Sequence, residues 1–326
     1  MNRPVALGFL GAGMIARGSL ARAVASLPDV RLAAVAARDV RRAEALGPDR
    51  AYGSYEALLG DDDVEAVYVA LANDAHFFWG RAALRAGKHV LCEKPLALNV
   101  PQVELMRAEA KAAGRLLVEA SWYQWHPRTA RARDLLATGA IGAVHHVESG
   151  FSFRGVTAGN YRLEPEKGGG AAYDVGCYPV SAVLWSAPPV QLVAARSRLG
   201  PSGVDLVSDL VLDLAGGGAA VVHCSIDELD RQWLRITGSG GEIELAGPSF
   251  TSHRAACELL LSGGRATVRE GFAPCDPYAL MLASFGAAVR GEQAWLVPLD
   301  QSRGCAAVLQ SARTSADAGG QPVPLP

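Results

Sequence analysis

The first 120 residues alternate short apolar runs with segments in which apolar residues recur every three or four positions. The apolar runs are typical of strands buried on both faces, and the periodic segments are typical of amphipathic helices. The predicted strands cover residues 5–10, 31–37, 66–71, 89–92 and 115–119, and the predicted helices cover 14–26, 40–46, 55–59, 77–86 and 103–113. This order predicts an α/β Rossmann domain with a doubly wound parallel sheet.

After about residue 121 the pattern changes to an alternation with period two. Residues 206–214 place leucines on one face and valines and aspartates on the other. Three glycines then separate this run from a second one, which predicts an antiparallel hairpin. Further strands are expected at 143–154, 219–226, 232–237 and 242–245, and helices at 129–138, 278–290 and 301–316. The second half is therefore predicted to be an α+β domain with a large, mostly antiparallel open sheet, and the domains to cover residues 1–121 and 122–326.

Composition narrows the class of protein. The net charge of −2 argues against a nucleic-acid partner held by bulk positive charge. No segment reaches about 18 apolar residues without a charge, so no membrane partner is expected. The six cysteines are scattered without a C-x-x-C pair, so we expect reduced thiols, no metal site and a cytoplasmic protein.

A glycine-rich turn follows the first predicted strand. Residues 11–16 (GAGMIA) have the form G-x-G-x-x-A and open the first predicted helix. Gly11 allows a tight turn, and Gly13 lets the backbone approach a pyrophosphate at the start of the helix. The motif predicts a dinucleotide site that includes Gly11, Gly13, Met14 and Ile15.

The end of the second predicted strand bears on the choice of cofactor. An NAD site normally has an acidic residue at this tip, but Ala36 and Ala37 stand here, followed by Arg38. Arginine suits a 2′-phosphate and can stack on adenine. NADP is therefore favoured, while Asp39 leaves NAD possible, and a solvated Arg38 in a charged turn is the plain alternative.

The chain has only four lysines against 27 arginines, and one of them, Lys94, follows the fourth predicted strand. That strand ends at the carboxyl edge of the sheet, where doubly wound folds bind ligands. On position alone, a ligand-binding lysine and a solvated loop lysine are equally good interpretations.

Two longer runs carry a resemblance to a known family. Residues 86–95 (AGKHVLCEKP) resemble the first signature of the Gfo/Idh/MocA oxidoreductases, and residues 168–179 (GGGAAYDVGCYP) resemble the second. With the glycine turn and residues 73–76 and 236–243, the resemblance covers nearly the whole chain. It implies a nicotinamide cofactor, with further contacts from Asn73, His76, Glu93 and Lys94, and hydride exchange with a sugar or polyol.

The second signature ends in Tyr178, where many members have histidine. This variant resembles the branch that contains NADP-dependent xylose and dihydrodiol dehydrogenases and sugar 3-ketoreductases. Tyrosine, with a reference pKa near 10, is a poor base at neutral pH, but a neighbouring ammonium lowers that pKa, so Lys94 beside Tyr178 would be a usable catalytic pair. Asp174, four residues earlier, would orient a substrate hydroxyl or hold Lys94. A core tyrosine and a helix cap are the plain alternatives.

The remaining predictions concern substrate, assembly and activity. Trp122 and Trp125 would stack on a sugar ring or simply fill the core, and Arg162 would line the pocket. Too few helices are expected to cover both faces of the second sheet, which favours a homodimer or homotetramer. The chain is thus predicted to be an NAD(P)-dependent oxidoreductase acting on a sugar, polyol or dihydrodiol. The alternative is a non-catalytic sugar sensor or transcriptional regulator of the same fold, although such proteins lose the lysine or the acid.

Overall fold

The computed structural model describes residues 3–264 and 266–326, which form two compact units. The first unit contains residues up to 97, 101–122 and 276–299, and the second contains 98–100, 123–275 and 300–326. Residues 276–299 therefore belong to the first unit, although the sequence pattern grouped them with the second half of the chain.

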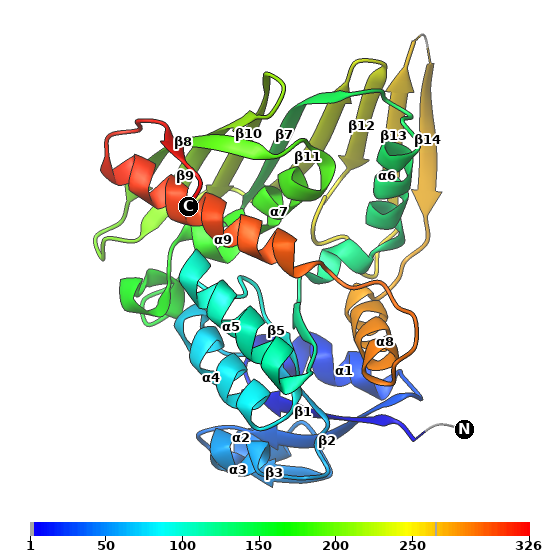
Figure 1. The fold of residues 1–326 in the computed structure, drawn as a ribbon, viewed down its shortest axis with the longest axis vertical. Coiled ribbons are helices and arrows are strands. Elements are labelled where there is room, and N and C mark those ends of the chain that lie inside the picture. The colour runs from blue at the N-terminus through cyan, green and yellow to red at the C-terminus, as the bar shows by residue number, and fades with distance from the viewer. Residues whose placement is uncertain (1–2, 265) are drawn as a thin grey trace. The chain divides into compact units, whose positions relative to one another are not determined.

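Within the described part of the first unit, six parallel strands form one sheet in the order β3-β2-β1-β4-β5-β6 (Figure 1). They are β1 (Val5–Leu10), β2 (Val30–Ala36), β3 (Arg50–Tyr52), β4 (Ala66–Val69), β5 (His89–Cys92) and β6 (Leu117–Glu119). The predicted doubly wound parallel sheet is confirmed. Strand β3 was not predicted because its three residues are only half-buried and carry no apolar run.

The helices of this unit connect successive strands. They are a π-helical turn (Ala16–Leu20) continued by α1 (Ala21–Ala25), α2 (Val40–Glu44), α3 (Tyr55–Leu59), α4 (Asn73–Arg85) and α5 (Val100–Ala113, whose first residue belongs to the second unit). Helix α8 (Pro277–Val289) comes from later in the chain and packs on α1 and β2. The approach is close, because a Cβ on Gly286 would lie 2.8 Å from the Val30 side chain.

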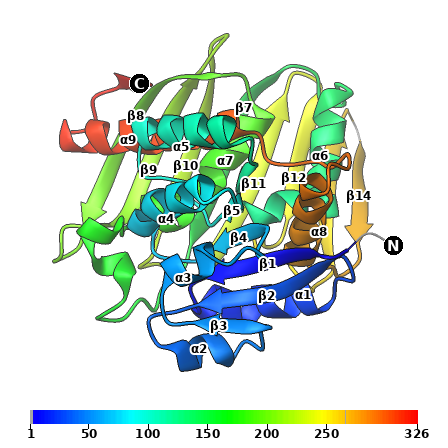
Figure 2. The same ribbon diagram turned by 60° about the horizontal axis from the view of Figure 1, so that its bottom comes forward.

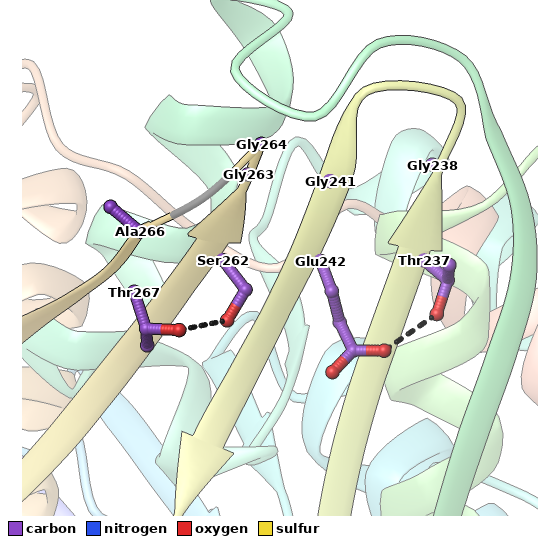
Figure 3. A pocket seen from close by; sticks show the side chains of 9 residues that line it. All are labelled: Thr237, Gly238, Gly241, Glu242, Ser262, Gly263, Gly264, Ala266 and Thr267. Carbon is purple, nitrogen blue, oxygen red and sulfur yellow. Dashed lines mark hydrogen bonds between the residues drawn. The ribbon is translucent and has the colours of Figure 1, made fainter.

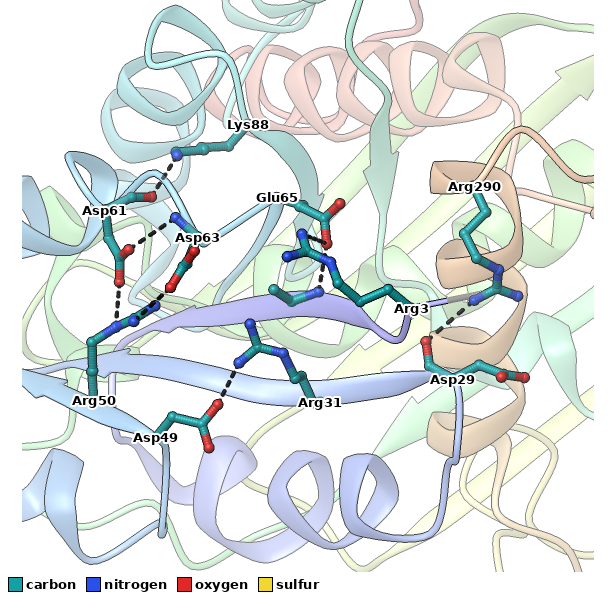
Figure 4. Close-up of polar contacts among 11 residues, drawn as sticks. Arg3, Asp29, Arg31, Asp49, Arg50, Asp61, Asp63, Glu65, Lys88 and Arg290 are labelled. Carbon is teal, nitrogen blue, oxygen red and sulfur yellow. Dashed lines mark hydrogen bonds and ion pairs between the residues drawn. The ribbon is translucent and has the colours of Figure 1, made fainter. Parts of the chain in front are cut away.

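The amino ends of these strands carry a set of ion pairs (Figure 4). Arg50 pairs with Asp61 at 2.7 Å and with Asp63 at 2.8 Å, and the Arg290 guanidinium after α8 donates to the Asp29 carbonyl at 3.2 Å. Solvent screens pairs with an exposed arginine such as Arg50, so they contribute little to stability. They fasten loops at the end of the sheet opposite to the glycine turn.

The second unit is built on a mixed sheet with the order β14-β13-β12-β11-β7-β10-β9-β8-β15 among the described residues. Its strands are β7 (Val144–Ser152), β8 (Val190–Leu199), β9 (Asp205–Leu214), β10 (Gly218–Ser225), β11 (Arg231–Gly238), β12 (Gly241–Ala246), β13 (Cys257–Gly263), β14 (Ala266–Phe272) and β15 (Val323–Pro324). Strands β7 and β10 pair in parallel and the other pairs are antiparallel. The mostly antiparallel sheet and its two predicted hairpins are confirmed.

One face of this sheet carries the helices of the unit (Figures 1 and 2). They are α6 (Pro127–Ala137), α7 (Cys177–Ser186) and α9 (Leu299–Asp317, whose first residue belongs to the first unit). The alternation read from the sequence determines which side chains face them: Leu210 and Leu212 of β9 are buried, whereas Val211 between them is 46% exposed. On β7, Gly150 is required by its cross-strand partner, since a Cβ there would lie 2.2 Å from the Trp233 ring.

Four strands of this sheet were missed by the sequence pattern, among them the two-residue β15. A bulge between Val190 and Leu192 shifts the register of β8 and breaks its period of two. The edge strand β14 is exposed along most of its length and so shows no apolar face. Its neighbour β13 lies next to that edge and buries only alternate residues at its start.

A buried arginine organises the loop that follows β12. Arg128, in the first turn of α6, is 1% exposed and donates to the carbonyls of Ala246 and Pro248 at 2.7 Å each. It also donates to the Ser249 carbonyl and the Ser252 hydroxyl. Burial lowers the pKa of Arg128. Its hydrogen bonds to backbone carbonyls hold the 246–252 loop in one conformation.

We expect Arg128→Met to lower the free energy of unfolding by about 2–4 kcal/mol, because several buried carbonyls would lose their donor. The matched control is Arg131→Met on the same helix, where the ion pair with Glu270 at 2.8 Å is partly exposed. That variant should leave the free energy of unfolding nearly unchanged, because solvent screens its ion pair. Urea unfolding measures both, and equal effects would contradict the prediction.

Candidate active site

The glycine turn follows β1 as predicted. Gly11 has φ = +108°, and a Cβ there would lie 2.5 Å from the Ala70 carbonyl oxygen, so no other residue fits. A Cβ on Gly13 would meet nothing closer than 3.9 Å, and Met14 is 69% exposed. Ile15 is partly buried and Ala16 is fully buried against the sheet. The turn thus leaves its backbone at residues 13–14 open, which fits the close approach of a pyrophosphate.

The tip of β2 carries a basic cluster. Arg38 is exposed, and the nearby Arg42 donates to the Ala12 carbonyl of the glycine turn at 3.1 Å. Burial raises the pKa of Tyr55, and the charges of Arg38 and Arg42 oppose that rise, so all three side chains are neighbours. Asp39 caps α2 by accepting from the Arg41 backbone N–H at 3.1 Å and also pairs with the Arg41 side chain at 3.2 Å. Asp39 is the acidic residue that could have bound the ribose of NAD, but here its carboxylate binds groups of its own helix, α2.

Lys94 lies in a turn that buried carboxylates hold in place. Glu93, at the end of β5, is 7% exposed and accepts from the Tyr68 hydroxyl at 2.6 Å and from the Lys94 backbone N–H at 3.3 Å. Two residues later, the Leu96 backbone N–H donates to the Glu119 carboxylate at 2.9 Å. Both strand ends thus fix the backbone around Lys94.

A histidine supports the same turn from α4. His76 is fully buried, with Nδ1 2.8 Å from the Pro95 carbonyl oxygen and Nε2 3.1 Å from that of Leu71. Burial lowers the pKa of His76, the Lys94 charge acts in the same direction, and the hydrogen bonds to the two carbonyls oppose this shift. Asn73, the first residue of α4, is also buried. His76 therefore fastens the loop after β4 to the turn that carries Lys94.

In the second unit, Tyr178 lies among aromatic rings. Its ring centroid is 5.8 Å from that of Tyr123, 5.4 Å from that of Phe151 and 5.9 Å from that of Phe250. Phe250 lies in the loop that Arg128 holds. The cage keeps Tyr178 8% exposed and restricts its rotation.

Asp174 precedes Tyr178 by one turn of continuous helix. Residues Ala172–Gly176 form a π-helical turn that runs directly into α7. Asp174 and Tyr178 therefore lie on one helical segment, as the sequence analysis assumed. The Asp174 carboxylate is 3% exposed and accepts from Arg162 Nε at 2.5 Å. Asp174 and Arg162, predicted in separate roles, are thus direct partners.

The predicted aromatic contacts are more deeply buried than a sugar platform requires. Trp122 is 4% exposed and stacks on Tyr278 at 4.6 Å within the first unit, and Trp125 of the second unit is 9% exposed. Gln124 between them is fully buried, and its amide makes no hydrogen bond among the described residues. A substrate role for the two tryptophans stays a prediction.

Two open surface hollows contain no predicted site residue. The larger, of about 480 Å³, lies at the ends of β11–β14 (Figure 3). It is lined by Thr237, Gly238, Gly241, Glu242, Ser262, Gly263, Gly264, Ala266 and Thr267. The smaller, of about 320 Å³, lies on α3 and α4 beside Trp79. In the described ranges no three His, Cys, Asp or Glu side chains gather as metal ligands, and no helix is long and apolar enough to span a membrane.

Comparison with known proteins identifies the family. Residues 5–121 match the model of an oxidoreductase family with an NAD-binding Rossmann fold, and residues 129–244 match the Gfo/Idh/MocA C-terminal domain. A D-xylose 1-dehydrogenase (NADP⁺) of Haloferax volcanii is 38% identical over 95% of this chain and 98% of that protein. The chain belongs to the Gfo/Idh/MocA family of oxidoreductases. A trans-1,2-dihydrobenzene-1,2-diol dehydrogenase of Xenopus laevis is 35% identical over 70% of this chain and 71% of that protein.

A solved structure has the same overall chain fold. It is a 3-ketoreductase from Actinomadura kijaniata in complex with NADP and TDP-benzene, with a TM-score of 0.88 and 28% identity. The match covers 96% of this chain and 98% of that one. Structures of the same ketoreductase include variants in which a lysine is replaced by alanine or glutamate and a tyrosine by phenylalanine.

Sequence reasoning missed the residues that support the site. Tyr68 and Glu119 lie inside or at the end of apolar strands, where a hydroxyl and a carboxylate must have partners. A polar residue at the carboxyl end of a buried parallel strand was therefore an available signal. Arg42 and Arg128 gave none, because surface arginines are common in this chain.

Proposed function

We propose that this protein is an NADP-dependent oxidoreductase, with NAD as a possible second cofactor. It transfers a hydride between the nicotinamide and a hydroxyl or carbonyl carbon of a sugar, polyol or dihydrodiol. The xylose dehydrogenase, the dihydrodiol dehydrogenase and the ketoreductase all support this substrate class. The observation that carries the proposal is a lysine in a rigid turn and a tyrosine in an aromatic cage, in a chain of this family.

The residues at the carboxyl edge of the first sheet fit the cofactor. The open backbone after Gly13 would receive the pyrophosphate, and Arg38 with Arg42 would hold a 2′-phosphate. Glu93 and His76 would act mainly by fixing the turn, since both are buried against other groups. When bound, the nicotinamide supplies or accepts the hydride.

Lys94 and Tyr178 would handle the proton. The phenol would donate to a carbonyl oxygen during reduction, and its phenolate would accept the hydroxyl proton during oxidation. The lysine and the tyrosine replaced in the ketoreductase variants are 84 residues apart in that chain, which is also the separation of Lys94 and Tyr178. Asp174 would orient a substrate hydroxyl from its partnership with Arg162.

A non-catalytic sugar sensor is the alternative function. What disfavours it is that both groups of the proton-transfer pair are present and that each is held by buried neighbours. The six reduced thiols, five of them buried, support a cytoplasmic location.

We also propose that the protein is a homodimer or homotetramer joined through the open face of the second sheet. Leu192, Val211 and Val221 lie on adjacent strands of that face and are 37–46% exposed, with Val211 opposite Val221 in the β9–β10 register. An apolar patch of this kind on a sheet face favours burial against a second copy.

For cofactor choice, NADP should bind more tightly than NAD, and Arg38→Ala should remove most of that preference. A charge-assisted hydrogen bond to phosphate contributes about 1.5–3 kcal/mol, or roughly 10- to 150-fold in affinity. The control is Arg31→Ala, at the amino end of the same strand (Figure 4). Titration of both cofactors into the three proteins measures this, and a wild type that prefers NAD would contradict it.

For the proton-transfer pair, Tyr178→Phe removes only a hydroxyl and should leave NADP binding close to wild type. Turnover should fall by about 10²–10⁴. Lys94→Met should be at least as damaging, and the double variant little worse than the poorer single one. The exposed Lys111→Met on α5 serves as control and should keep full activity. A Tyr178→Phe protein with normal turnover in a screen of aldoses, polyols and dihydrodiols would favour the sensor.

For assembly, light scattering at micromolar concentration should give at least twice the chain mass of 34.1 kDa. Val211→Lys with Val221→Lys should shift the mass to that of the monomer, because two buried ammonium groups would face the second copy. Val268→Lys on β14, where valine is 52% exposed, should leave the assembly intact. A monomeric wild type would refute the proposal.

A further inference from the structure

Arg162 lies beside two residues of the proposed catalytic group although it belongs to a separate short helix, Tyr161–Leu163. Its Nε donates to the Asp174 carboxylate at 2.5 Å, and its side chain is four-fifths buried. The guanidinium also lies 4.9 Å from the Tyr161 ring centroid and 6.0 Å from that of Phe153. Two rings and a carboxylate therefore hold the guanidinium in place.

Electrostatics connect this guanidinium to Tyr178. Burial lowers the pKa of Arg162, but Asp174, Tyr161 and Tyr178 more than offset that effect, so the side chain stays charged. The contribution of Tyr178 is the smallest of these, and the structural link between the two residues is Asp174, which binds Arg162 and lies in the same continuous helix as Tyr178. Asp174, one helical turn before Tyr178, brings a negative charge to the same region.

The three aromatic rings packed on Tyr178 carry no charge. Phe151 and Phe250 are apolar, and burial raises the pKa of Tyr123, which keeps that phenol neutral. On its own helix, the Cys177 thiol donates to the Asp174 carbonyl, and burial raises the pKa of Cys224 on β10. Arg162 and Asp174 are the charged groups that the contacts above connect to Tyr178 within this unit. The Asp205 carboxylate lies at the start of the same helical segment, where it accepts from the Ala172 backbone N–H at 2.7 Å.

We propose that Arg162 is a positioning residue for proton transfer by Tyr178. It holds the Asp174 carboxylate in place and keeps a permanent positive charge beside the phenol, so that Lys94 is not the only cation favouring the phenolate. This inference rests on the proposed function, in which Tyr178 is the acid/base.

The two members of the ion pair should act in opposite directions. A positive neighbour favours the phenolate, so losing the Arg162 charge should move the Tyr178 limb of the pH profile to higher pH. Losing the Asp174 charge leaves the guanidinium uncompensated and should move that limb to lower pH. A purely structural role for the pair would lower activity without these opposite shifts.

The experiment compares the pH dependence of kcat/KM for alcohol oxidation, with the best substrate from the panel above. Arg162→Met should raise the apparent pKa of the limb by about one unit, which gives roughly tenfold lower activity at pH 7 that recovers in alkaline buffer. Arg162→Lys keeps the charge and should leave the limb within about half a unit. Asp174→Asn should lower it, and the double variant Arg162→Met with Asp174→Asn should return it toward wild type.

Arg131→Met is the matched control, because it breaks a similar arginine–carboxylate pair with Glu270 in the same unit. It should not move the limb. If Arg162→Met does not fold, Arg162→Gln replaces it. An Arg162 variant whose kcat/KM falls equally at every pH, or an Asp174→Asn protein whose limb stays in place, would overturn the proposal. A limb that survives in Tyr178→Phe would instead overturn the proposed function.

Discussion

The geometry at the carboxyl edge of the first sheet depends on one buried hydrogen bond, from the Tyr68 hydroxyl to the Glu93 carboxylate at 2.6 Å. A carboxylate that is 7% exposed would be costly without such a partner, because charge is poorly stabilised away from water. Its second oxygen accepts from the Lys94 backbone N–H at 3.3 Å. The position of the lysine backbone is thus set by β4 and β5 rather than by the loop itself.

Neighbouring elements repeat this arrangement. Glu119, at the end of β6, accepts from the Leu96 N–H, and His76 of α4 reaches the Pro95 carbonyl. Each contact uses a buried polar side chain to fix a backbone group, so together they cover both sides of the turn. A buried polar group without a partner destabilises the fold, whereas a complete set of such hydrogen bonds makes the backbone rigid. A rigid backbone suits the proposed role of Lys94, which would contact its ligand in one geometry. In the second unit, packing against three aromatic rings rather than hydrogen bonding restrains the Tyr178 side chain.

The elements that sequence could predict are those whose signal is local. The glycine turn, the buried parallel strands and the leucine face of β9 follow from period and residue type alone, and the structure contains them. Asp174 and Tyr178 were found through their motif, but the partnership of Asp174 with Arg162 was not, because a contact over 12 residues of irregular chain leaves no periodic trace. For the same reason β14, with no buried face, and α8, which joins the first unit from the far end of the chain, were beyond what a local pattern can indicate.

Arginine and lysine differ in ways that bear on the roles proposed for Arg162 and Lys94. Arginine stays charged when four-fifths buried, and its planar fork can stack on Tyr161 while it donates to Asp174. It is therefore suited to a constant field that does not take part in proton transfer. Lysine is a compact ammonium with three rotatable donors, which suits the contact with a substrate oxygen that we propose for Lys94. In a chain with only four lysines, these properties favour the proposed roles, with Arg162 as the fixed charge and Lys94 at the reacting oxygen.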